Sequence, residues 1–122
     1  LDAEKMAEAA QLLVGTHDFR ALAVGHPQDR SAVREVFRWE VARSEETIVI
    51  ECEASGFLKQ QIRKANGILT EIGRGKYPIN KVTEALAGDV SGTPLLSAHG
   101  LCLISVKYSS STNFGTENTG TE

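Results

Sequence analysis

Apolar residues recur at helical spacing along residues 56–75. They are separated by steps of three and four, which is the pattern of one face of an amphipathic helix: Ile62, Ala65, Leu69 and Ile72. Gly73 and Gly75 follow this pattern, and glycine is typical of a helix end. The sequence therefore predicts a helix here with one buried face.

Two further helices are predicted by the same spacing. The first covers residues 1–15, where Asp2 can act as the cap and Gly15 as the stop, with the stripe Met6, Ala9, Ala10 and Leu13. The second begins at Pro78, because proline is favoured in a first helical turn, and it ends at Gly88.

Apolar and polar residues alternate over residues 33–42 and 47–54, which predicts two strands. The side chains expected on the buried face are Phe37, Trp39, Val41, Ile48, Ile50 and Cys52. The polar turn between the runs predicts an antiparallel hairpin. A last strand is predicted over residues 101–108, whereas residues 16–30 are predicted to be a connector.

This order of elements predicts an α+β fold in which helices pack on an antiparallel or mixed sheet. With 122 residues the chain is long enough for one domain with one core. We expect this domain to span residues 1–108. Residues 109–122 are rich in Ser, Thr, Asn and Gly, so they are expected to form a disordered tail.

The formal charge of −3 does not indicate a nucleic-acid binder, so any such surface must be a local patch. The helix over residues 56–75 offers one, with five basic residues around a single acid, Glu71: Lys59, Arg63, Lys64, Arg74 and Lys76. On the pattern alone, a solvated basic helix face is favoured over a functional site. The scattered histidines and cysteines do not predict a metal site, and no apolar run reaches the roughly 20 residues that span a bilayer.

Four segments together resemble one family, the TruA-like tRNA pseudouridine synthases, in the C-terminal half of its members. AAQLLVGTHDF (residues 9–19) resembles the family's AAxxLxGxHDF, and VREVFRWEV (33–41) resembles its VRxI strand. GFLKQQIRKANGILTEIGRGK (56–76) is similar to FLxxMVRxxxGxLxxVGxGK, and SAHGLCLISVKY (97–108) is similar to PxxGLxLxxVxY. The resemblance covers residues 6–108.

The resemblance implies that the chain belongs to an isomerase that converts uridine to pseudouridine in tRNA, without a metal or organic cofactor. In the family an aspartate nucleophile attacks a flipped-out uridine. That aspartate lies in a GRTDxGVHA-like motif of the N-terminal half, and this chain does not contain the motif. The chain alone is therefore expected to be inactive, with the N-terminal half of the same enzyme as a partner.

Two residues carry family roles by position, and a third matches a family residue. Arg63 matches the arginine that pairs with the catalytic aspartate, and a guanidinium suits this role because it can make two parallel hydrogen bonds to a carboxylate. Leu101 matches the leucine that packs on the target base. Phe57 matches the family phenylalanine, and we interpret it as a core or pocket-floor residue. The other basic residues of the helix, Lys59, Lys64, Arg74 and Lys76, are expected to contact RNA.

The resemblance further implies an intracellular protein without a membrane segment, and family members often form homodimers. Which compartment holds the protein, and which uridine it modifies, are not specified by the sequence. The alternative functions are an RNA-binding domain that has lost catalysis and a plain α+β interaction domain.

Overall fold

The computed structural model describes the backbone of residues 1–90, 92, 102–108 and 117–119, and the side chains of residues 1–90 and 92. The helices in these ranges are α1 (Ala3–Gln11), α2 (Gln61–Gly73) and α3 (Lys81–Leu86), with a 3-10 turn η1 (Arg20–Leu22). The strands are β1 (Gly15–Asp18), β2 (Val33–Ser44), β3 (Thr47–Ala54), β4 (Cys102–Tyr108) and β5 (Glu117–Thr119).

The strands form one mixed sheet in the order β1-β2-β3-β4-β5. Neighbouring strands are antiparallel except for β3 and β4, which are parallel. The two helices α2 and α3 lie between β3 and β4 in the chain, and they provide the long crossover that a parallel pair requires. The expected α+β class and the antiparallel β2–β3 hairpin are confirmed.

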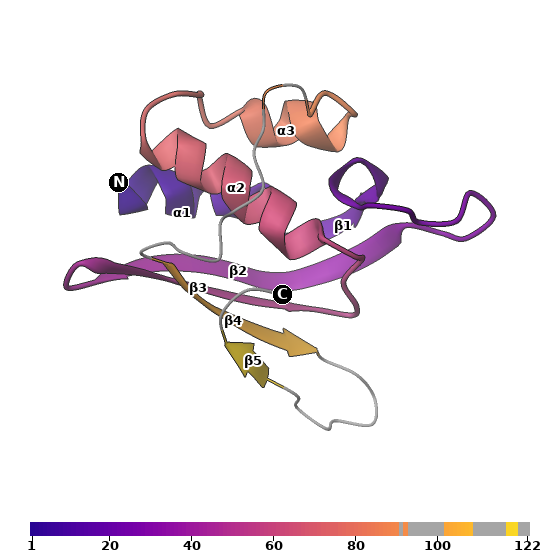
Figure 1. Cartoon of the computed structure of the whole chain (residues 1–122), viewed down its shortest axis with the longest axis horizontal. Helices are drawn as coiled ribbons and strands as arrows, with labels where there is room; N and C mark the ends of the chain where they lie inside the picture. Colours follow the sequence, from indigo (N-terminus) through magenta and orange to yellow (C-terminus); the bar gives the residue numbers. More distant parts are fainter. Residues whose placement is uncertain (91, 93–101, 109–116, 120–122) are drawn as a thin grey trace.

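Helices α1 and α2 cover the same face of the sheet, and α3 packs on the outer side of α2 (Figure 1). The core lies between the helices and the sheet. The predicted helix stripes face this core. Its largest fully buried side chains are Met6, Leu13, Phe19, Leu22, Trp39, Ile48, Ile50, Ile62, Ile68, Leu69 and Ile72. The opposite face of β2 and β3 carries mostly polar side chains, as expected for an antiparallel sheet that is covered on one face.

Helices α1 and α2 approach each other closely at Gly73. A Cβ atom on this glycine would lie 2.6 Å from the sulfur of Met6, so only glycine fits without displacement of a core side chain. At the same contact the backbone N–H of Asp2 donates to the carbonyl of Gly73 at 2.8 Å. Asp2 also caps α1, as predicted, by accepting from the N–H of Lys5.

The predicted burial of Phe37 is wrong. The register between β2 and β3 shifts between Val36 and Arg38, so Phe37 is the extra residue of a β-bulge. Val36 and Trp39 therefore both face the core, whereas Phe37 is turned outward and is 44% exposed.

The predicted helix at residues 56–75 is shorter than expected at its N-terminal end, because α2 begins only at Gln61. Gln60 has a left-handed backbone (φ 66°, ψ 1°), a conformation that cannot continue an α-helix. Lys59 therefore lies in the preceding loop and not one helical turn before Arg63. Helix α1 ends at Gln11, before the predicted stop at Gly15, and strand β1 runs from Gly15 into the predicted connector. Four residues are too few for alternation to reveal this strand.

Within the predicted tail, Glu117–Thr119 form β5 and pair with β4. The other residues of the predicted tail lie outside the described part of the chain. None of the described helices has the length and apolar character needed to cross a membrane.

Candidate nucleic-acid interface

The N-terminal end of α2 brings together four of the predicted site residues. Arg63 and Lys64 lie in the first turn of the helix and are half-buried. Phe57 and Lys59 lie in the short loop before it, Phe57 partly buried and Lys59 exposed. The N-terminus of a helix carries partial positive charge, so these cations add to a field that favours an anionic ligand.

Contacts on three sides fix the loop before α2. The ring of Phe57 packs edge-on against Trp39 of β2, with centroids 5.9 Å apart. The N–H of Leu58 donates to the side-chain oxygen of Gln61 at 2.8 Å. The carbonyl of Lys59 accepts from the N–H of Val24 at 3.1 Å, which ties this loop to the segment after η1.

This loop lines an open hollow of about 320 Å³ formed by Phe57, Leu58, Lys59 and Gln60. Gln60 adopts its left-handed conformation here although it is not glycine, and its side-chain oxygen is buried without a hydrogen bond among the described residues. Both features cost free energy, and such costs concentrate at functional sites. The physical character of the loop thus favours a functional role over a plain connection.

The other predicted RNA-binding residues lie at the opposite end of α2. Arg74 follows Arg63 by eleven residues, which corresponds to about 16 Å along the helix axis. Arg74 forms an ion pair with Glu71 at 3.6 Å, and the ammonium of Lys76 lies 5.5 Å from the centre of the Tyr77 ring. The structure therefore does not unite the five basic residues in one patch.

Leu101, the predicted contact to the target base, lies outside the described residues. Strand β4 begins at the next residue, Cys102, and pairs in parallel with β3.

Arg38 forms an ion-pair cluster on the sheet face opposite the helices. It contacts Glu40, Glu51 and Glu53 at 2.9, 3.4 and 3.5 Å. Partial burial lowers the pKa of Arg38, but the hydrogen bonds and the charge of these glutamates outweigh this, so its pKa is raised. With three carboxylates around one guanidinium, this patch is acidic and unsuited to RNA phosphates.

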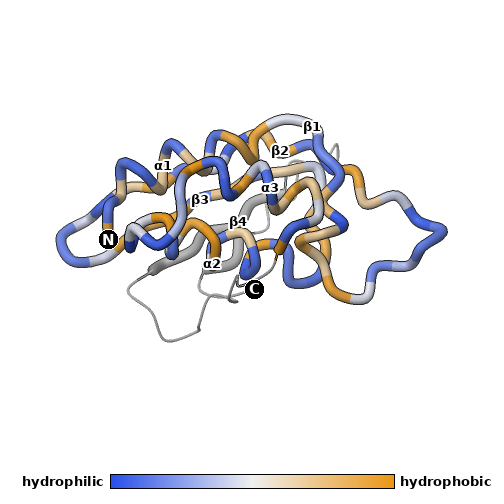
Figure 2. Tube along the Cα trace, turned by 90° about the horizontal axis from the view of Figure 1, so that it is seen from above, coloured by the Kyte–Doolittle hydropathy of each residue, from blue (hydrophilic) through white to orange (hydrophobic). Residues whose placement is uncertain are grey.

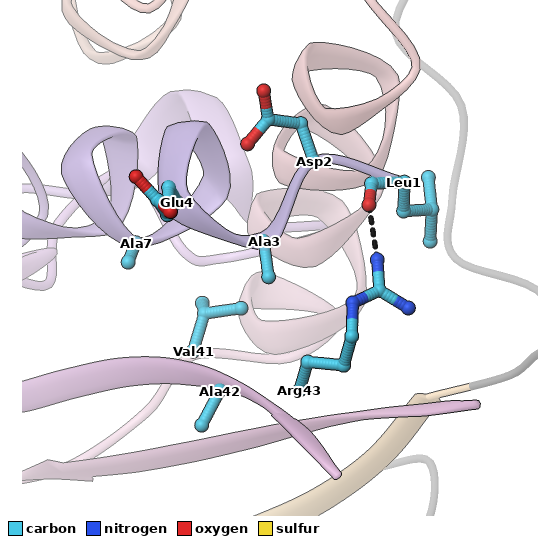
Figure 3. Close-up of a pocket in the computed structure, with 8 residues that line it drawn as sticks. All are labelled: Leu1, Asp2, Ala3, Glu4, Ala7, Val41, Ala42 and Arg43. Carbon is cyan, nitrogen blue, oxygen red and sulfur yellow. Dashed lines mark hydrogen bonds between the residues drawn. The ribbon is translucent and has the colours of Figure 1, made fainter. Parts of the chain in front are cut away.

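A larger hollow of about 480 Å³ lies between α1 and the end of β2 (Figure 3). Arg43 reaches across it and donates to the carbonyl of Leu1, as the dashed line in Figure 3 shows. None of the predicted site residues lines this hollow. It lies at the far end of β2 from the loop that carries Phe57.

Among the described residues, no group of three or more His, Cys, Asp and Glu side chains is arranged to hold a metal ion. His17 contacts the carbonyl of Val14, and Asp18 accepts from the N–H of Arg20. Both side chains therefore bond to backbone groups, and Phe19 is fully buried beside them.

Comparison with known proteins identifies the family. The family model described as tRNA pseudouridine synthase matches residues 9–109, which is most of the chain. The chain therefore belongs to the tRNA pseudouridine synthase family, as the four motifs indicated.

Individual relatives agree with this assignment. The chain is 43% identical over 110 residues to tRNA pseudouridine synthase A of Acidiphilium cryptum, covering 88% of this chain and 43% of the relative. It is 40% identical to the tRNA pseudouridine synthase A of Syntrophotalea carbinolica, and the match covers 88% of this chain and 44% of the relative. The match to the Nitrosomonas eutropha protein is 38% identical over 121 residues and covers 97% of this chain and 43% of the relative. The chain thus spans less than half the length of these curated relatives.

Proposed function

We propose that this chain is the C-terminal half of a tRNA pseudouridine synthase, which isomerises uridine to pseudouridine in tRNA. The observation that carries the proposal is the coverage of the relatives. About nine-tenths of this chain aligns with only 43–45% of enzymes named tRNA pseudouridine synthase A. The rest of such an enzyme would supply the residues that this chain lacks, above all the aspartate nucleophile.

Arg63 is the residue of this half that takes part in the chemistry. Its place in the first turn of α2, beside the hollow of the preceding loop, suits a side chain that reaches a group on a second domain. Two parallel hydrogen bonds from the guanidinium would hold the carboxylate of the nucleophile and keep it ionised for attack on the flipped-out uridine. The field at the N-terminus of the helix favours the same ionised state.

Two apolar side chains complete the proposed base pocket. Phe57 is held edge-on against Trp39, so its ring has a fixed orientation at the floor of the hollow. Leu101 is proposed to pack on the face of the uracil ring. An apolar wall of this kind can hold a flipped base without competing for the hydrogen-bonding edge.

The RNA surface of this half is proposed to centre on Lys59 and Lys64, which flank Arg63. Arg74 and Lys76, at the other end of α2, would contact a distant part of a large folded RNA. Recognition of this type depends on shape and phosphate contacts more than on base edges. The remaining proposals are an intracellular location, no cofactor, and a homodimer as in other members of the family.

Replacement of Arg63 by lysine tests the catalytic role. In the longer protein that contains both halves, Arg63→Lys should lower kcat by at least a hundredfold, because one ammonium cannot replace a two-point clamp. The affinity for tRNA should change little, since the positive charge is kept. Arg43→Lys, at the other end of the sheet, is the matched control, and the protein that carries it should keep the kcat of the unaltered protein. An Arg63→Lys protein that folds normally and turns over at the rate of the unaltered protein would remove Arg63 from the mechanism.

A further inference from the structure

The segment that connects η1 to β2 projects from the body of the domain as an ordered arm, residues 23–31. In Figure 2 this arm extends beyond the end of the sheet as a long loop. None of its residues is fully buried, and Ala23 at its start is the residue that packs against the core. Exposed loops on a rigid scaffold are a common place for binding residues.

Side chains from its base hold the arm in one conformation. The guanidinium of Arg20 donates to the carbonyls of Pro27 and Arg30, at 3.2 and 2.6 Å. The carbonyl of Ser31 accepts from His26 at 2.9 Å and from Arg34 at 3.1 Å. The arm is therefore preorganised, and a partner that binds it would not have to order it.

The arm is continuous with the proposed RNA surface at α2. Its residue Val24 donates its N–H to the carbonyl of Lys59. The side chain of Arg34 lies against Gly56, with its Nε 3.4 Å from where a Cβ on that glycine would stand. Arg34 thus lies immediately beside the loop that carries Phe57 and Lys59.

The cations at this arm are not neutralised. In the part of the chain that the structure describes, none of Arg20, Arg30, Arg34 and Lys59 forms an ion pair, whereas Arg38, Arg74 and Lys81 each contact carboxylates. Two of the five N–H groups of Arg20 and two of those of Arg34 bond to carbonyls. Each guanidinium keeps its charge and three further donors. Only one carboxylate, that of Asp29, lies within the arm.

We infer that the arm and the arginines at its base form a second phosphate-binding surface, which extends the surface at Lys59 and contacts the tRNA backbone. This arm surface consists of Arg20, Arg30 and Arg34. The inference rests on the proposed function, because tRNA is the partner that the function supplies. Guanidinium groups on an exposed loop suit phosphate oxygens, and phosphate contacts carry no sequence preference.

The salt dependence of tRNA binding by this chain tests the inference. Arg30→Gln should weaken binding severalfold and should reduce the slope of log K against log salt by about one, the value for one phosphate contact. Binding of an unrelated RNA duplex should weaken by the same factor. Lys5→Gln on α1 removes one exposed cation at the other end of the molecule and should change neither quantity. Arg30 is exposed, so its replacement should leave the melting midpoint unchanged.

A second variant separates charge from preorganisation. Arg20→Lys keeps the charge, but an ammonium lacks the planar fork that spans the two carbonyls, so the arm should loosen. We expect a loss of affinity of about threefold to tenfold, compared with less than twofold for Arg30→Lys. Equal and negligible effects of both lysine variants would contradict a preorganised arm.

Lys59→Gln distinguishes failure of this inference from failure of the proposed function. If Lys59→Gln weakens tRNA binding while Arg30→Gln leaves both the affinity and the salt slope unchanged, the arm surface is refuted and the surface at α2 stands. If the unaltered chain does not bind tRNA even at low salt, the RNA-binding role proposed for this half fails, and the arm surface with it.

Discussion

Trp39 of β2 donates its indole N–H to the side-chain oxygen of Asn66 of α2, across 3.0 Å inside the core. Both residues are fully buried, and the ring of Phe57 packs edge-on against the same tryptophan. One side chain of the sheet thus fixes both α2 and the loop before it. The position of Arg63 depends on this contact, because Arg63 lies one turn before Asn66.

Replacement of Trp39 by phenylalanine should lower the free energy of unfolding by about 2 kcal/mol or more, because it removes a buried hydrogen bond and leaves a small cavity. Denaturation by urea measures this change. In a double-mutant cycle with Asn66→Ala, the combined loss should be smaller than the sum of the two single losses by about 1 kcal/mol. Simple additivity would show that the bond between the two side chains contributes nothing.

Two alanine variants at the bulge in β2 compare a buried side chain with an exposed one. Val36→Ala should destabilise the domain by roughly 2 kcal/mol, because it empties part of the core. Phe37→Ala should cost less than about 1 kcal/mol, although it removes many more atoms, because Phe37 is 44% exposed. A larger loss for Phe37→Ala than for Val36→Ala would place the bulge elsewhere in the strand.

Gln60 offers a stabilising variant. Gln60→Gly should raise the free energy of unfolding by about 1 kcal/mol, since it relieves the left-handed backbone and removes the buried side-chain oxygen that lacks a partner among the described residues. Glu45 has a similar φ of 58° but an exposed side chain in a hairpin turn. Glu45→Gly, the control, should gain less. Thermal melting compares the two, and a lower melting midpoint for Gln60→Gly would show that its side chain stabilises the loop.

Cys52 and Cys102 should not form a disulfide with each other. In the parallel register of β3 and β4, Cys102 is opposite Ile48 and Cys52 is opposite Val106, an offset of four residues. This offset corresponds to about 13 Å along the strands, whereas a disulfide requires Cα atoms within about 7 Å. Thiol titration of freshly prepared, denatured monomer without reductant should find two thiols, and a count of zero would contradict the register.

The core faces of most helices and strands could be predicted from the sequence, because each follows from a local period of apolar residues. The bulge at Phe37 could not, since one inserted residue reverses the face of the strand and leaves the alternation nearly unchanged. The sequence places the start of α2 too early, because a left-handed residue such as Gln60 has no distinct sequence signal when it is not glycine or asparagine.

The candidate site was only partly predictable for a related reason. Arg63, Lys64 and their neighbours are close in sequence, so a local pattern and a motif sufficed to find them. Arg34 lies beside the loop before α2, and Arg20 bonds to the arm, through the folding of distant segments onto one another, which no local pattern contains. The VR pair at residues 33–34 of the second motif offers a signal for Arg34, but the alternation assigns this pair only to a strand, as the structure does.

The most direct test of the proposed function is a pseudouridine assay with unmodified tRNA, followed by nuclease digestion and chromatographic separation of the two isomers. This chain alone should form no product above background, because it has no GRTD-like motif to supply the nucleophile. Addition of a separate N-terminal half that carries the motif should produce pseudouridine, and Arg63→Lys in this chain should abolish it. Product formed by this chain alone, and lost on replacement of one of its own aspartates, would contradict the account.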